Sequence, residues 1–211
     1  MIMRRVKIPR GRIITPDVIL SAYRQGCFPM ANERGQIGFY FYEPRGIIPL
    51  DERFTIRRSL RNAMKKQDYR IAFDTSPSEV LRACSRIGEV PEDELWLSDE
   101  MINLYMRLFE MGYVHTVEVW KDNPDGESEL VGGLYGLSFG AAFCGESMFS
   151  RAPFASQIAL VHLVERLCQR GFRLLDAQMP SDHLKQFGLI ECGQKEYMEQ
   201  FNIASKIDVL F

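Results

Sequence analysis

Residues 141–177 read AAFCGESMFSRAPFASQIALVHLVERLCQRGFRLLDA, and the spacing of the apolar residues changes twice along this stretch. Ala141 to Met148 is typical of a strand, whereas the apolar residues from Ala155 to Arg170 recur at helical spacing, and Gly171 is a natural C-cap. Phe172 to Ala177 is typical of a buried strand. This order of strand, helix and strand predicts a parallel pair joined by a right-handed crossover.

Two further strands precede this unit. Tyr113 to Trp120 and Leu130 to Phe139 are rich in β-branched and aromatic residues, and the polar segment from Lys121 to Glu129 joins them. The short connections favour an antiparallel meander. A meander that leads into one β-α-β crossover predicts an α+β fold with a GNAT-like acyltransferase domain.

The first fifty residues predict a helix followed by turns and short strands. Thr15 and Pro16 are typical of a helix start, and Gly26 is typical of the end of that helix. Between Cys27 and Pro49, prolines and glycines surround an aromatic run, which predicts turns and short strands. We therefore expect a small N-terminal domain with an aromatic loop at 1–50 and a GNAT-like catalytic domain at 51–211.

Charge is distributed unevenly along the chain. Residues 1–70 contain 15 Lys and Arg against 6 Asp and Glu, a net charge of +9, and the remaining residues contain 11 against 22, or −11. A basic region is a candidate surface for a polyanion, and an acidic region suits a cationic group. Solvated charge that only keeps the protein soluble is the alternative.

The cysteines, the apolar runs and the histidines limit the classes of protein to which this chain can belong. Five widely spaced cysteines, without a C-x-x-C pair, favour reduced thiols in a cytoplasm. No apolar run approaches the roughly 18 residues that a membrane span requires. The three histidines have no ligand spacing with one another or with the cysteines, so no metal site is predicted. We expect a soluble cytoplasmic protein.

Polar residues interrupt two strands that otherwise have the composition of a core. Glu146 lies in the first strand, and Asp176 and Gln178 lie at the end of the second, where alternation should point them the same way. A carboxylate in such a place has to face a cavity, a cation or solvent, and parallel sheets bind ligands at the carboxyl ends of their strands. The alternatives are an ion pair of Glu146 with Arg151 and capping roles for Asp176 and Gln178.

The turn before the crossover helix disfavours coenzyme A. A pyrophosphate is held by backbone N–H groups of a glycine-rich turn, but residues 150–156 read SRAPFAS and Pro153 has no N–H. No G-x-S-x-G motif is present either. We therefore predict no cofactor.

Several ordered motifs resemble the leucyl/phenylalanyl-tRNA–protein transferase family. They are GESMFSR at 145–151, ALVHL at 159–163, LDAQ at 175–178 and the Asp182-His183 pair, preceded by YRQGCFP at 23–29, EPR at 43–45, SLR at 59–61, WLS at 96–98, GYVHTVEVW at 112–120 and LVGGLYG at 130–136. The resemblance covers about residues 15–201. Where the family commonly has two tryptophans, this chain has Phe39 and Tyr40.

The resemblance implies transfer of Leu or Phe from aminoacyl-tRNA to the α-amine of a protein that begins with Arg or Lys, which marks that protein for N-end-rule degradation. The tRNA ester is already activated, so no ATP is required. The resemblance also implies that Gln178 orients the amine and that Asp176 polarises Gln178 and favours proton removal. Glu146 would hold a cationic group or the terminal ribose.

Further substrate contacts follow from the same resemblance. The terminal adenine is expected to stack on four aromatic residues: Trp96, Tyr105, Phe39 and Tyr40. Two residues close to Glu146 in the sequence, Met148 and Ser150, are expected to complete the substrate site. The tRNA phosphates are expected to bind a predicted basic helix: Arg57, Arg58, Arg61, Lys65 and Lys66. Trp96 and Tyr105 could instead be ordinary core aromatics. Two other functions stay open, a GNAT-type N-acetyltransferase that uses acetyl-CoA and a non-catalytic tRNA-binding protein.

Overall fold

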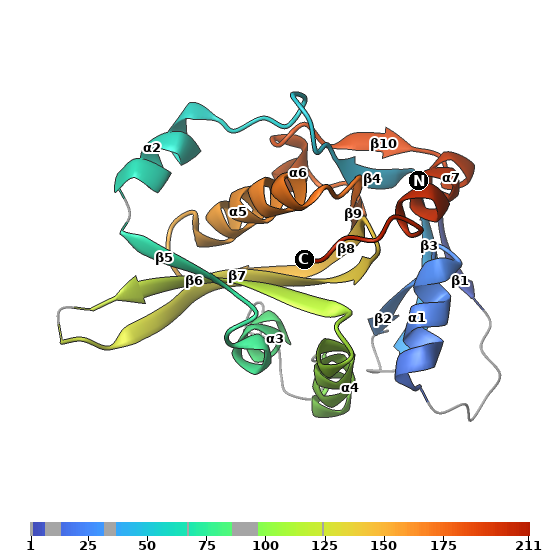
Figure 1. Ribbon diagram of the computed structural model, residues 1–211, viewed down its shortest axis with the longest axis horizontal. Helices are drawn as coiled ribbons and strands as arrows, with labels where there is room; N and C mark the ends of the chain where they lie inside the picture. The colour runs from blue at the N-terminus through green and yellow to red at the C-terminus, as the bar shows by residue number, and fades with distance from the viewer. Residues whose placement is uncertain (1, 7–13, 32–36, 67, 86–96, 124) are drawn as a thin grey trace.

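Two β-sheets of unequal size organise the chain in the computed structural model, which describes residues 2–6, 14–31, 37–66, 68–85, 97–123 and 125–211 (Figure 1). The smaller sheet is antiparallel with the order β1-β3-β2, formed by β1 (Ile2–Val6), β3 (Ile37–Glu43) and β2 (Phe28–Ala31). Helix α1 (Pro16–Arg24) precedes β2, and the Thr15 side chain caps it by accepting the Val18 N–H. The predicted N-terminal helix and short strands are confirmed.

The larger sheet has seven strands in the order β10-β4-β9-β8-β7-β6-β5. The strands are β4 (Arg45–Ile48), β5 (Tyr69–Phe73), β6 (Val114–Asp122), β7 (Ser128–Phe139), β8 (Ala142–Ser150), β9 (Leu174–Gln178) and β10 (Ile190–Cys192). Strands β5 to β8 form an antiparallel meander, whereas β8 and β9 are parallel and α5 (Ala155–Arg170) connects them. The predicted meander and crossover unit are therefore confirmed within a mixed sheet.

Strand β4 belongs to this larger sheet although it directly follows β3. It pairs with β9 on one side and β10 on the other, and it precedes the domain boundary predicted after residue 50. The division at that residue stays a prediction. The pairing carries Arg45 from the N-terminal part of the chain to the end of β9.

Helices cover both faces of the larger sheet (Figure 1). Helix α5 lies on one face with its apolar side chains buried, and Gly171 ends it in the left-handed conformation, with φ of 83°. The opposite face carries α3 (Pro77–Ser85) and α4 (Asp99–Glu110). The remaining helices are α2 (Arg58–Lys66), α6 (Asp182–Lys185) and α7 (Gln194–Ala204). One hydrophobic cluster therefore forms on each face of the sheet.

The part of the chain that the structure describes contains no helix that is both long and apolar enough to cross a membrane. In the same ranges, no three His, Cys, Asp or Glu side chains are grouped in a way that could hold a metal ion. All five cysteines are free thiols.

Candidate active site

Glu146 is the extra residue of a β-bulge in β8. Tyr135 of β7 pairs with Ser147, whereas the next residue, Gly136, pairs with Gly145, so Glu146 has no partner on β7. A bulge bends its strand and redirects the side chain of the extra residue. This irregularity explains how a carboxylate is accommodated within a strand of core composition.

A second irregularity lies next to it, in β9. Gly46 of β4 pairs with Gln178 and Ile47 pairs with Asp176, which leaves Ala177 as the extra residue. Gln178 has a φ of 58°, in the left-handed region that residues other than glycine adopt at a cost of about 1–3 kcal/mol. The surrounding contacts have to stabilise this conformation.

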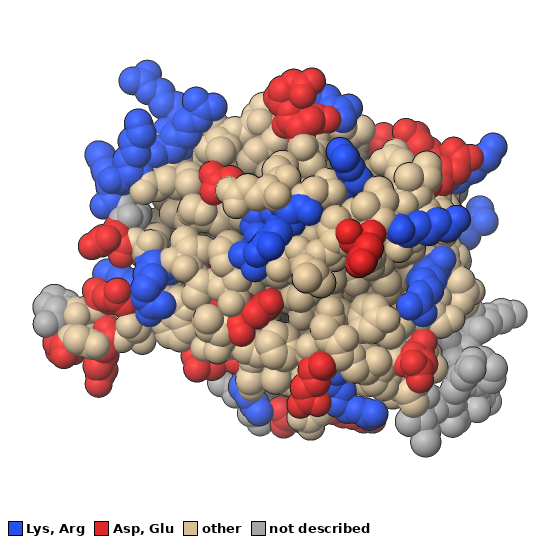
Figure 2. Space-filling model, viewed as in Figure 1, with Lys and Arg blue, Asp and Glu red and all other residues tan. Residues whose placement is uncertain are grey.

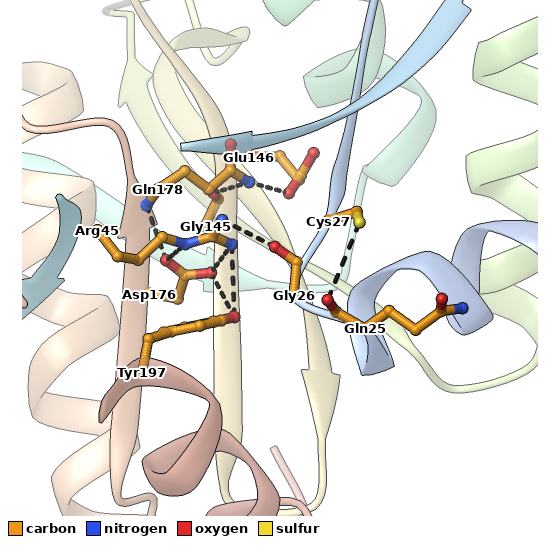
Figure 3. Close-up of polar contacts among 9 residues, drawn as sticks. All are labelled: Gln25, Gly26, Cys27, Arg45, Gly145, Glu146, Asp176, Gln178 and Tyr197. Atoms are coloured by element: carbon orange, nitrogen blue, oxygen red, sulfur yellow. Dashed lines mark hydrogen bonds and ion pairs between the residues drawn. The ribbon is translucent and has the colours of Figure 1, made fainter. Parts of the chain in front are cut away.

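The Asp176 carboxylate is the centre of a buried network (Figure 3). Arg45 forms a bidentate ion pair with it, from Nε to Oδ1 at 2.8 Å and from Nη2 to Oδ2 at 2.6 Å, and neither side chain is exposed. The Tyr197 hydroxyl donates to Oδ2 at 2.9 Å, and the Gln178 backbone N–H donates to Oδ1 at 2.8 Å. A third Arg45 nitrogen donates to the Gly26 carbonyl at 3.1 Å. This network holds the backbone of Gln178 in place.

The side chain of Gln178 contacts Glu146 instead of Asp176 (Figure 3). Its Nε2 donates to Glu146 Oε1 at 2.5 Å and to the Gly145 carbonyl at 3.0 Å. Both amide hydrogens are thereby used, so the amide oxygen is the group that remains to accept a hydrogen bond from a substrate. The predicted contact of Asp176 with Gln178 therefore runs through the backbone N–H.

Glu146 lines the cavity at this site, together with Asp176. Its second oxygen accepts a hydrogen bond from the Tyr105 hydroxyl at 3.3 Å. Burial raises the pKa of Glu146 to about 8, and the negative charge of Asp176 adds to this effect. A carboxyl group with such a pKa can both accept and release a proton near neutral pH. The alternative partner, Arg151, instead donates to the Leu130 carbonyl at 3.2 Å.

A largely apolar cavity of about 280 Å³ lies beside Glu146. The parallel pairing of β8 and β9 runs from the Ala142–Leu174 pair to the Cys144–Asp176 pair, and residues beyond the last pair contribute to the cavity wall. The apolar part of the wall includes aliphatic side chains of β4, β7, β9, α5 and α6: Ile48, Leu134, Leu160, Leu163, Leu175 and Leu184. Polar residues, among them Glu146, Asp176 and His183, also line the cavity. The cavity can therefore hold an apolar side chain next to a titratable carboxyl group.

The predicted substrate residues are found in different surroundings. Met148 lines the cavity, and Tyr105 is fully buried against Glu146. The Ser150 hydroxyl donates to the Ala152 carbonyl at 2.8 Å and accepts the Ser156 N–H at 3.3 Å, so it shapes the turn that leads into α5. Met148 and Tyr105 thus lie together with Glu146, whereas Ser150 has partners of its own.

The aromatic residues expected around an adenine are only partly assembled. Phe39 is 3% exposed and belongs to the hydrophobic core, whereas the neighbouring Tyr40 is partly exposed. Trp96 lies outside the described residues. Of Phe39 and Tyr40, only Tyr40 presents surface to a ligand.

The five basic residues predicted to bind tRNA form an exposed cluster over α2 (Figure 2). Leu60 and Ala63 anchor the helix through its buried side, and Arg57 donates to Gln157 of α5 at 3.3 Å. The segment from Arg57 to Lys66 contains no acidic residue. Its positive charge is therefore not neutralised locally.

Two residues of the site were not assigned a role from the sequence. Arg45 belongs to the EPR motif, which could have identified it, although its partner Asp176 is 131 positions away. Tyr197 is on the buried side of α7, where its spacing is that of an ordinary core residue. No local pattern could have paired it with Asp176.

Two family models and several relatives match this chain. The family model described as leucyl/phenylalanyl-tRNA protein transferase matches residues 47–202, and the model of the N-terminal domain of the same family matches residues 12–44. The chain is similar to three relatives named leucyl/phenylalanyl-tRNA–protein transferase. That of Paramagnetospirillum magneticum is 48% identical over 193 residues, covering 90% of this chain and 88% of the relative. That of Akkermansia muciniphila is 46% identical, covering 87% and 92%, and that of Rubrobacter xylanophilus is 40% identical, covering 94% and 98%. Both parts of the chain match, so this protein belongs to the leucyl/phenylalanyl-tRNA–protein transferase family.

Proposed function

We propose that this protein transfers Leu or Phe from aminoacyl-tRNA to the α-amine of an acceptor protein. The observation that carries this proposal is the Gln178–Glu146 pair at the edge of an apolar cavity, in a chain of this family. The carboxyl group supplies a proton acceptor, and the cavity supplies a place for an uncharged side chain.

The cavity would bind the side chain of the transferred residue. The surface of its wall is mainly apolar, which favours Leu and Phe over polar or charged residues because burying an unpaired polar group is costly. Met148 at the wall has a flexible side chain that can adapt to a branched or a flat substituent. The donor would thus be selected by shape and by apolar character.

The chemical step requires an uncharged amine. Glu146 would accept one proton from the acceptor ammonium, and the amide oxygen of Gln178 would orient the resulting amine. The nitrogen lone pair then attacks the ester carbon, a C–N bond forms and the C–O bond to the ribose breaks. The ribose oxygen takes the second N–H proton, and the proton on Glu146 is released to solvent. Asp176 supports this step by fixing the backbone of Gln178.

The acceptor would begin with Arg or Lys, which would mark it for N-end-rule degradation. Residues 71–211 carry a net charge of −11, so a cationic acceptor residue is favoured beside the Glu146 carboxyl group, outside the apolar part of the cavity that would hold the transferred side chain. The basic cluster over α2 would bind tRNA phosphates, and Tyr40, together with Trp96, would contact the terminal adenine. A cytoplasmic location agrees with five free cysteines and an aminoacyl-tRNA substrate.

We also propose that the larger domain is a GNAT-like acyltransferase fold. An antiparallel meander followed by a parallel pair that separates beyond Cys144 and Asp176 supports this assignment. The cavity at this separation is where the acyl group would lie. No observation favours acetyl-CoA as the acyl donor.

A transfer assay with labelled Phe-tRNA tests the proposed function. Three acceptor peptides, identical except for Arg, Lys or Ala at the first position, are compared by the specificity constant for transfer. We expect modification of the Arg and Lys peptides, and at least about tenfold slower modification of the Ala peptide, because 1.4 kcal/mol of preference already gives that factor. Failure to modify any peptide would refute the activity. Equal constants for the three peptides would refute the selection of a cationic acceptor.

A further inference from the structure

His183 of α6 lies at the mouth of the cavity and has no part in the proposed chemical step. It lines the cavity together with Glu146 and Asp176. Asp176 is fully buried, whereas His183 is exposed, so the histidine lies where the cavity opens to solvent. A substrate that enters the cavity therefore has to pass the imidazole ring.

The ring of His183 is available to a ligand. Within the described residues, its backbone carbonyl accepts a hydrogen bond from Gln186, but neither ring nitrogen has a partner. By contrast, both ring nitrogens of His115 contact side chains, and His162 contacts Glu165 at 3.0 Å. Of the three histidines, His183 is the one that combines a place at the cavity with unused ring nitrogens.

The basic cluster over α2 begins beside this mouth. The Thr55 N–H donates to the Phe187 carbonyl at 3.2 Å, which holds the segment before α2 against the residues that follow α6. Arg57 comes two residues later and donates to Gln157 of α5 at 3.3 Å. About one helical turn separates Gln157 from Leu160, which belongs to the cavity wall. A tRNA bound to the cluster therefore reaches the cavity over the rim where α6 lies.

The covalent structure of the donor decides which of its groups comes to this rim. In the proposed function, the transferred side chain occupies the apolar part of the cavity and the ester lies beside Glu146. The ribose is bonded to the ester oxygen, so it lies next to the ester, towards the mouth. With one ribose oxygen in the ester and the 5′ carbon joined to phosphate, a single ribose hydroxyl of the terminal nucleotide stays free. That hydroxyl distinguishes RNA from DNA.

The imidazole of His183 suits this hydroxyl better than a phosphate. Partial burial lowers the pKa of His183, and the positive charge of Arg57 lowers it further, so the ring is mainly neutral at neutral pH. A neutral imidazole has one donor and one acceptor nitrogen, and a hydroxyl group can likewise donate and accept. A phosphate oxygen only accepts, and it binds more strongly to a guanidinium group, which Arg57 supplies at the same rim.

We propose that His183 forms a hydrogen bond with the free ribose hydroxyl of the terminal nucleotide and so selects an RNA end for transfer. The contact fixes the ribose at the mouth and takes no proton, so the chemical step remains with Glu146 and Gln178. His183 is then a specificity-determining residue of that reaction. This inference rests on the proposed function.

A binding cycle tests the contact without requiring transfer. The probe is Phe-tRNA with an amide at the 3′ carbon in place of the ester, prepared with and without the 2′-hydroxyl of its terminal adenosine, and Kd is measured by fluorescence anisotropy. The wild-type protein should bind the form with the hydroxyl about three- to tenfold more tightly, which is the value of one hydrogen bond. His183→Phe keeps a ring but no hydrogen-bonding nitrogen, so it should bind both forms equally.

His162→Phe is the matched control. It makes the same replacement on α5, at a side chain that contacts Glu165 and is outside the described wall of the cavity. We expect it to keep the wild-type preference for the hydroxyl. An undiminished preference in His183→Phe would overturn the inference, and so would the absence of any preference in the wild type. Failure of the wild type to bind either form would instead refute the proposed function.

Discussion

Replacing Tyr197 with Phe should destabilise the protein through the loss of one hydroxyl group. This hydroxyl donates to Asp176 at 2.9 Å in a network without exposed surface. A hydrogen bond to a charged group contributes about 1.5–3 kcal/mol. Because Asp176 keeps the Arg45 ion pair and the Gln178 N–H, we expect the lower part of that range, about 1.5–2 kcal/mol. In a chain of this length, that loss lowers Tm by about 3–8 °C.

Differential scanning calorimetry at pH 7 measures this change. The control is Tyr113→Phe, whose ring packs against Phe139, whose hydroxyl has no hydrogen bond with the described residues and whose Tm should stay close to that of the wild type. Binding of Phe-tRNA should be unchanged in Tyr197→Phe, since Tyr197 lies beneath Asp176, away from the basic cluster over α2. A wild-type Tm in Tyr197→Phe would show that the hydroxyl does not support Asp176, and the structural reasoning would be refuted.

Three further predictions concern the surface, the cavity and pH. Replacing Arg57, Arg61 and Lys65 together with Ala should weaken Phe-tRNA binding. The slope of the logarithm of the binding constant against the logarithm of the salt concentration should become smaller by about 0.9 or less per lost phosphate contact. An unchanged slope would mean that these side chains are only solvated and do not bind phosphate. Leu163→Phe should narrow the cavity and reduce transfer of Phe more than transfer of Leu, which competition between the two charged tRNAs measures; equal reduction would contradict the assignment of the cavity. The folded-state pKa of Glu146, about 8, is above the ordinary glutamate value of 4.5, so its stabilising contribution is complete below the unfolded-state pKa and is lost as pH rises towards 8. Glu146→Gln should therefore raise Tm relative to the wild type at pH 9, and an equal or lower Tm there would contradict the raised pKa.

The spacing of apolar residues was sufficient to predict the helix and the strands of the meander and crossover unit. The helical spacing from Ala155 to Arg170 coincides with α5, and the β-rich segments became the meander of β6, β7 and β8. These signals are local, because each follows from which side chains of one element are buried. Glu146, Asp176 and Gln178 were identified for the same reason, as polar residues within strands of core composition.

The geometry of the site could not be predicted in this way. Strict alternation assumes a regular strand, but the bulges at Glu146 and Ala177 depend on how neighbouring strands pair. The partner of Asp176 is Arg45, far away in the sequence, and β4 brings it near only because it inserts beside β9. Such long-range pairing does not change the spacing of apolar and polar residues in either segment, so it cannot be predicted from that spacing.

The central claim is that Glu146 takes the proton of the acceptor amine beside Gln178. The most direct test is the single-turnover rate of Phe transfer to an Arg peptide at pH 8, measured for the wild type and for Glu146→Gln. Loss of a proton acceptor should lower this rate about 10²- to 10⁴-fold. The affinity for Phe-tRNA should stay within about twofold, because phosphate contacts supply most of it. A single-turnover rate of Glu146→Gln equal to that of the wild type would contradict the account.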